Sequence, residues 1–96
     1  MLTSKQRARL RAMANTLNDT VLIGKEGITD AVLAQAEEVL EKHELIKIKV
    51  LETAMMTPRE AQGILCEALD AEPVQCIGKK LTLYRRSKEN PRIELN

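Results

Sequence analysis

The sequence has 96 residues, which is enough for one compact domain and leaves little room for a second. Apolar residues make up 44% and charged residues 30%, as in ordinary globular proteins, and no apolar run approaches the length needed to span a bilayer. The formal net charge of +1 excludes a chain that is basic throughout, and the polar stretch 1–11 is not a secretory signal, so we expect a cytoplasmic protein.

The first predicted element is a helix over residues 4–16. Thr3 fits the N-cap position, and Gln6 three residues later completes a capping-box pattern. The apolar stripe at helical spacing consists of Leu10, Met13 and Leu17. A short apolar run over residues 21–23 then predicts a buried strand.

The clearest helical pattern covers residues 30–43, with Thr29 as the expected cap. Its apolar face consists of Val32, Leu33, Ala36, Val39 and Leu40. Its opposite face carries Glu37, Glu38 and Glu41. Residues 46–50 alternate between apolar residues and lysines, which predicts a strand with Lys47 and Lys49 on its solvated face.

A third helix is predicted to begin at Thr57, because a cap residue, Pro58 at the first helical position and Glu60 at the third agree. Its expected apolar stripe consists of Ala61, Ile64, Leu65, Ala68 and Leu69. Residues 73–84 predict a β-hairpin with a tight turn at Gly78–Lys79.

The predicted order is one helix followed by β-α-β-α-β-β. This order indicates an α/β fold with a mixed four-stranded sheet packed with helices, in which the β-α-β units are parallel and the hairpin antiparallel. We expect residues 1–88 to form a single domain. Residues 89–96 should be a polar tail, since Pro91 argues against regular structure there.

Charge is distributed unevenly along the chain. Residues 1–25 contain five basic side chains and one acid, residues 26–72 contain four basic side chains and eleven acids, and residues 73–96 contain six and two. If the two basic ends meet in space, one face of the protein attracts phosphate.

The segment Gly24-Lys25-Glu26-Gly27 lies where a strand passes into a helix. Glycines at such a junction let backbone N–H groups approach a phosphate, and the helix N-terminus adds a favourable dipole. Glu26 is an awkward charge for such a clamp. The alternative is a sharp turn without a ligand, and the pattern alone favours this simpler interpretation.

A second group of cations surrounds the predicted hairpin and consists of Lys79, Lys80, Arg85, Arg86 and Lys88. Cations held in fixed positions suit phosphate contacts, and solubilising side chains are the alternative. The chain has no Trp or Phe and one Tyr, so it has no platform for stacking unpaired bases. Tyr84 makes either one stacking contact or an ordinary strand contact.

No candidate catalytic set is present. His43 ends the acidic helix, with no nucleophile or orienting group at a recognisable spacing. His43, Cys66 and Cys76 lack the paired spacing of zinc ligands, so we expect no metal or cofactor and interpret both cysteines as reduced and half-buried. The sequence predicts a protein that is not an enzyme and takes no small-molecule substrate.

Three stretches, "LTSKQRARLRAMA", "VLIGKEGITDAVLAQAEEVLEKHELIKIKV" and "VQCIGKKLTLYRRSKE", strongly resemble the CRM domain (chloroplast RNA splicing and ribosome maturation) in its single-domain bacterial form, the YhbY type. The resemblance covers about residues 2–88. It depends on the ordered combination of the G-x-x-G segment, "HELIK" before the second strand and "IGKKLTLYR" at the hairpin.

This resemblance implies a fold similar to the C-terminal domain of translation initiation factor three. It also implies RNA binding and association with precursors of the large ribosomal subunit, whose rRNA is the expected partner. The acidic helix would then face either solvent or a basic ribosomal protein. The expected RNA-binding residues are Arg7, Arg11, Gly24, Lys25, Glu26, Gly27, Lys79, Lys80, Arg85 and Arg86. The rival interpretation is a protein-interaction module that works through the acidic face Glu37, Glu38 and Glu41, with RNA contact incidental.

Overall fold

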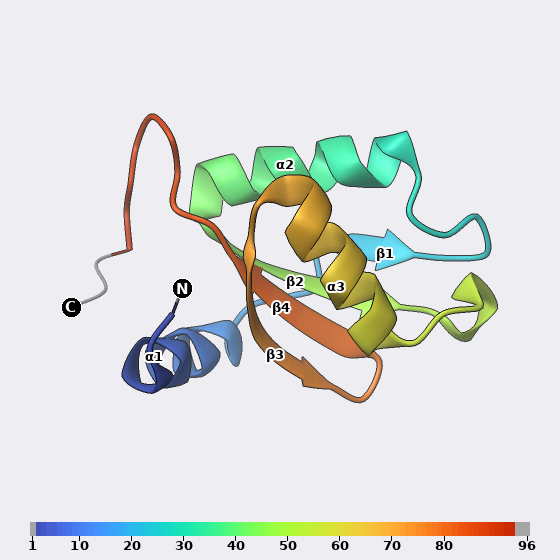
Figure 1. Ribbon diagram of the computed structural model, residues 1–96, viewed down its shortest axis with the longest axis horizontal. Helices are drawn as coiled ribbons and strands as arrows, with labels where there is room; N and C mark the ends of the chain where they lie inside the picture. The colour runs from blue at the N-terminus through green and yellow to red at the C-terminus, as the bar shows by residue number, and fades with distance from the viewer. Residues whose placement is uncertain (1, 94–96) are drawn as a thin grey trace.

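The computed structural model describes residues 2–93. Its elements follow the predicted order, with one additional short 3-10 helix that the sequence pattern did not indicate. They are α1 (Ser4–Ala14), β1 (Val21–Ile23), α2 (Asp30–His43), β2 (Leu45–Val50), η1 (Glu52–Ala54), α3 (Pro58–Leu69), β3 (Glu72–Ile77) and β4 (Lys80–Tyr84), as Figure 1 shows. No helix within these residues has the length and apolar character that crossing a membrane requires.

The four strands form one mixed sheet in the order β1-β2-β4-β3, which confirms the predicted fold class. β1 runs parallel to β2, while β4 lies between β2 and β3 and is antiparallel to both. The connection from β2 through α3 to β3 therefore joins two parallel strands that are not neighbours. A register shift between Pro73 and Gln75 interrupts the β3 ladder, as expected where proline lacks a backbone N–H.

One face of the sheet is covered by α2 and α3, and the main core lies between them and the strands. Strand residues of alternate positions, including Ile23, Ile48 and Leu83, are fully buried there. From the helices, Leu40 of α2 and Leu65 of α3 complete this core. The predicted caps are confirmed, because the side chain of Thr29 accepts from the first turn of α2 and Thr57 forms a capping box at α3. These caps start both helices where the sequence pattern begins.

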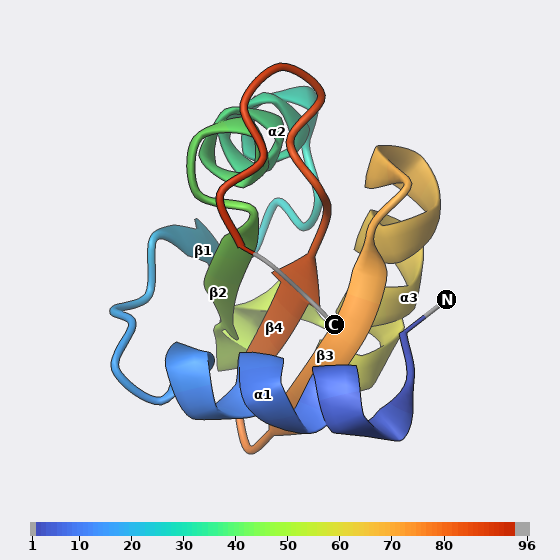
Figure 2. The same ribbon diagram turned by 90° about the vertical axis from the view of Figure 1, so that its left-hand side faces the viewer.

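The helix α1 covers only part of the opposite face. Leu10 and Ala14 are fully buried against the end of the sheet where β2 begins and β4 ends. Figure 2 shows α1 in front of the strands at this end. The predicted stripe is wrong beyond Leu10, because Met13 is 37% exposed and Leu17 is 36% exposed. The helix stops at Ala14, so Leu17 lies in the connection to β1 and not on the helix.

Two further predicted burial patterns need correction. In α3, Ile64 is 49% exposed, while Gln62 is buried and its amide donates to strand carbonyls at 2.9 Å (Gln75 O) and 3.2 Å (Thr82 O). These carbonyls lie in β3 and β4, where a buried amide satisfies polar groups that an apolar side chain would leave unpaired. In β1, Leu22 is 56% exposed, because β1 is an edge strand whose second face is not covered.

Candidate nucleic-acid interface

The glycine loop connects the end of β1 to the start of α2. The N–H of Gly27 donates to the carbonyl of Gly24 at 2.9 Å and closes the turn, with Lys25 and Glu26 exposed at its tip. Gly27 has a φ of +71°, a conformation that other residues adopt only with strain. Gly24 has no such requirement, and a Cβ added there would meet its nearest neighbour, Leu51 Cδ1, at an ordinary 3.8 Å. The turn conformation therefore requires glycine at position 27 but not at position 24.

The glycine loop and the β3–β4 turn lie at the same end of the sheet, on either side of the end of β2. The N–H of Leu51 donates to Ile23 O at 2.9 Å, next to the loop. The N–H of Val50 donates to Lys79 O at 2.7 Å, in the turn. The structure thus brings Lys25 and Lys79 to one end of the sheet. In Figure 1 the loop between β1 and α2 lies at the right and the turn between β3 and β4 at the lower right.

Both lysines of the turn have carboxylate partners that the sequence pattern did not indicate. Lys79 Nζ lies 2.8 Å from Glu52 Oε1, and this hydrogen bond is the main reason that the pKa of Glu52 is lowered. Lys80 Nζ lies 3.4 Å from Asp19 Oδ2. The Lys79–Glu52 pair is exposed, and Lys80 is exposed in its pair with the half-buried Asp19. Ion pairs open to solvent contribute little to stability and are screened by salt, so a phosphate can compete for either ammonium group.

The cations of α1 lie at the other end of the sheet from the glycine loop. Arg11 is exposed and Arg7 half-buried on a helix that packs where β2 begins. Arg86 is exposed and follows Tyr84 at the same end, where β4 finishes. The expected RNA-binding set therefore divides into two groups, one at each end of the sheet.

Arg85 belongs to neither group. Its side chain is 8% exposed, and its guanidinium makes ion pairs with Glu37 and with Glu41, the second at 3.5 Å. It also donates to Leu69 O at 3.2 Å, which links α2 to the end of α3. A side chain buried in this way does not present its charge to a phosphate, so we leave Arg85 out of the interface.

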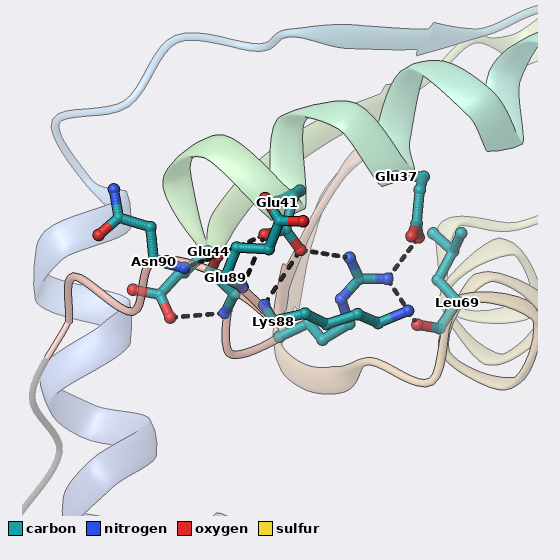
Figure 3. A network of polar contacts seen from close by, with 9 residues as sticks. Glu37, Glu41, Glu44, Leu69, Lys88, Glu89 and Asn90 are labelled. Atoms are coloured by element: carbon teal, nitrogen blue, oxygen red, sulfur yellow. Dashed lines mark hydrogen bonds and ion pairs between the residues drawn. The ribbon is translucent and has the colours of Figure 1, made fainter.

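The acidic face of α2 holds the segment that follows β4, and it is not a free acidic surface. Figure 3 shows Glu37, Glu41 and Glu44 along α2 with residues 88–90 beside them. The hydroxyl of Ser87 and the backbone N–H of Lys88 are the main donors that lower the pKa of Glu41 from its ordinary value of 4.5 to about 2. The expected polar tail is therefore attached to the domain at least as far as residue 93.

Glu44 is fully buried in the same network. Burial opposes its ionisation, but backbone N–H groups of Ser87, Ile93 and Arg92 donate to its carboxylate, and the net effect lowers its pKa. Ile93 packs against the apolar cluster under α1. The side chain of Glu44 thus fixes the tail across the end of the domain where α1 lies.

Tyr84 is 8% exposed and packs with Leu10 under α1. Burial is also the main reason that its pKa is raised. Tyr84 therefore makes an ordinary strand contact, and the stacking role considered for it is not possible in this conformation. Cys66 and Cys76 are free and half-buried as expected, and burial raises the pKa of the Cys66 thiol to about 11.

Two lysines that were not among the expected RNA-binding residues also lie on this part of the surface. Lys47 and Lys49 project from β2 on the face that carries α1, with Lys47 Nζ 3.4 Å from Ala14 O. Lys49 lies directly opposite Lys80 in the β2–β4 ladder. The alternation of residues 46–50 predicted their shared face, but no sequence signal indicated that β4 would be the neighbour.

Comparison with known proteins shows which family the sequence belongs to. Residues 2–85 match the family model described as the CRS1 / YhbY (CRM) domain. The chain is 39% identical over 95 residues to "Probable RNA-binding protein YqeI" of Bacillus subtilis, covering 99% of both chains. It is 40% identical over 88 residues to "RNA-binding protein" of Haemophilus influenzae, covering 92% of this chain and 89% of the relative.

A solved structure agrees as well. The solution structure of the hypothetical protein SAV1595 from Staphylococcus aureus matches with a TM-score of 0.79 and 39% identity, covering 100% of both chains. The sequence match, the domain-wide coverage and the shared fold confirm the resemblance noted from the sequence: the chain belongs to the CRS1/YhbY (CRM) domain family.

Proposed function

We propose that this protein is a cytoplasmic RNA-binding accessory factor that associates with rRNA in precursors of the large ribosomal subunit. The observation that carries the proposal is that the glycine loop and the β3–β4 turn lie at the same end of the sheet, on either side of the end of β2. This end carries Lys25, Lys79 and Gly24, a glycine that the turn conformation does not require, and Lys80 follows as the first residue of β4. Relatives across the whole chain are named as RNA-binding proteins.

Phosphates are the part of RNA that this surface suits. The contacting cations in the proposal are Arg7, Arg11, Lys25, Lys79, Lys80 and Arg86, and the loop from Gly24 to Gly27 offers backbone N–H groups. Glu26 is exposed at the loop tip and weakens the loop's attraction for phosphate without removing its backbone donors. With Tyr84 buried, recognition depends on backbone and shape.

The rival interpretation, a protein-binding acidic helix, loses support from the network around α2. Glu37 and Glu41 are occupied by Arg85 and by the tail. Glu38 remains exposed and pairs with Lys42 at 3.4 Å. The acidic face left for a partner is small, and charge alone on so small a surface rarely supports a stable protein interface.

Sucrose-gradient fractionation of a cell lysate at low and high salt tests the proposal. Co-migration with immature large-subunit particles at low salt, lost at high salt, is the expected result, because each phosphate contact releases counterions. The double variant Lys79→Glu/Lys80→Glu should migrate as free protein, whereas Glu38→Gln should migrate like the wild type. Migration of the wild type as free protein at low salt would overturn the proposal.

A further inference from the structure

We infer that the open part of the sheet beside α1 is itself an RNA-contacting surface, with Lys49 as its central phosphate contact; this inference rests on the proposed function. The first observation is the cross-strand pair Lys49 and Lys80, which lie directly opposite each other in the β2–β4 ladder. Like charges at directly opposed positions destabilise a sheet. An anion held between the two ammonium groups removes that cost.

Within the described part of the chain, Lys49 has no acidic partner to offset this repulsion. Among residues 2–93, no carboxylate lies within ion-pair distance of its Nζ, and Asp19 pairs with Lys80 alone at 3.4 Å. Lys49 is moreover half-buried on the strand, so its stem is held in place and its charge is less screened than that of a fully solvated lysine. A phosphate bound beside such an unneutralised and partly shielded ammonium group gains more electrostatic energy than one bound beside a fully solvated lysine.

Two exposed apolar side chains flank the lysine pair. Leu22 of β1 lies opposite Lys49, and Ile77 of β3 lies opposite Lys80, so one row crosses all four strands. Leu22 is 56% exposed and Ile77 is 66% exposed. A small inorganic anion gains no binding energy from apolar neighbours. The sugars and bases next to an RNA phosphate can pack against Leu22 and Ile77, which removes apolar surface from water. The row therefore suits a polynucleotide.

The position of this row joins the two groups of the proposed interface. Leu45 and Tyr84, which pack under α1, lie on the same face of the sheet as Lys47, Lys49 and Lys80, because alternate residues of a strand share a face. The open surface thus runs from the cations of α1 to the turn and the glycine loop. An RNA backbone that contacts both groups passes over Lys49.

Charge reversal at Lys49 tests the inference on the full-length protein. Lys49→Glu places opposite charges across the ladder, so the fold should keep its melting temperature or gain a little. Its affinity for a fluorescein-labelled rRNA stem-loop should fall several-fold at low salt. The slope of log affinity against log salt should become shallower by about 0.7 to 0.9, as expected for one lost phosphate contact.

Lys42→Glu is the matched control, since it makes the same change of net charge on α2, away from this face. It should bind the stem-loop like the wild type, and equal effects of the two variants would overturn the inference. Loss of binding in Lys79→Glu/Lys80→Glu with full binding in Lys49→Glu would overturn the inference and leave the proposed function standing. Tight stem-loop binding that needs Lys49, in a protein absent from ribosomal precursors, would support the inference while the proposed cellular role fails.

Discussion

The backbone N–H of Ser87 donates a 2.7 Å hydrogen bond to the carboxylate of Glu44, although 43 residues separate them in the chain. Glu44 ends α2 in a left-handed conformation with a φ of +65° and is fully buried. That bond is to Oε2, and the other oxygen, Oε1, accepts from the backbone N–H groups of Arg92 and Ile93. A single carboxylate therefore connects the end of α2 to the segment that follows β4.

Replacing this carboxylate should destabilise the protein. In Glu44→Gln an amide nitrogen replaces one accepting oxygen, so at least one buried N–H of the tail loses its partner. We expect the free energy of unfolding to fall by about 1 to 3 kcal/mol, measured by urea denaturation. Glu38→Gln, on the exposed side of the same helix, should be neutral. A Glu44→Gln variant as stable as the wild type would show that the second carboxylate oxygen of Glu44 contributes nothing to stability.

Acid should release the tail before the core unfolds. The folded pKa of Glu41 is about 2, below its ordinary 4.5, so its contribution to stability is present above pH 4.5 and is lost as the pH falls through about 2. Amide resonances of Lys88 and Glu89, followed by NMR, should keep their positions at pH 4 and shift only near pH 2. Ser87→Ala removes the main donor and should move this transition to higher pH. Shifts centred near pH 4.5 in the wild type would contradict the assigned contacts.

Arg85 and Arg86 should have opposite effects although they are adjacent. Arg85→Ala leaves Glu37 and Glu41 without their buried cation. Because both carboxylates are partly exposed, we expect a loss of about 2 kcal/mol in unfolding free energy, less than for a fully buried pair. Arg86→Ala should leave stability unchanged and weaken RNA binding. Denaturation and filter-binding measurements on both variants separate these roles, and reduced RNA affinity in a fully stable Arg85→Ala protein would return Arg85 to the interface.

The two glycines of the loop allow the turn and the phosphate clamp to be tested separately. Gly27→Ala puts a Cβ at a φ of +71° and should cost about 1 to 2 kcal/mol of stability. In Gly24→Ala the added Cβ makes only an ordinary van der Waals contact with Leu51, so this variant should fold normally. If the backbone N–H groups of the loop contact phosphate, Gly24→Ala weakens RNA binding because the added Cβ keeps the phosphate away. Unchanged affinity in Gly24→Ala would leave the loop as a turn alone.

Local sequence patterns predicted the elements of this protein well. The capping boxes at Thr3 and Thr57 are confirmed, and α2 has the bounds that its apolar periodicity indicated. Each of these features depends on residues three or four positions apart, whose contacts form whenever the helix forms. For the same reason the turn at Gly78 could be placed, since a positive φ is a property of one residue and its neighbours.

The composition of the interface depended on contacts between distant parts of the chain. From the sequence, Arg85 was one of several cations near a hairpin. Its charge is buried only because the tail packs on α2, which brings Arg85 into contact with Glu37, 48 positions earlier in the chain. Lys49 was one of two solvated lysines, and only the insertion of β4 beside β2 placed it opposite Lys80. Apart from η1 and the end of α1, the sequence by itself determined which segments form helices and strands and that the ends of the chain are basic. The tertiary structure decided which charges are paired and which remain open, because pairing depends on strand order and on helix packing, and neither is encoded within a single segment.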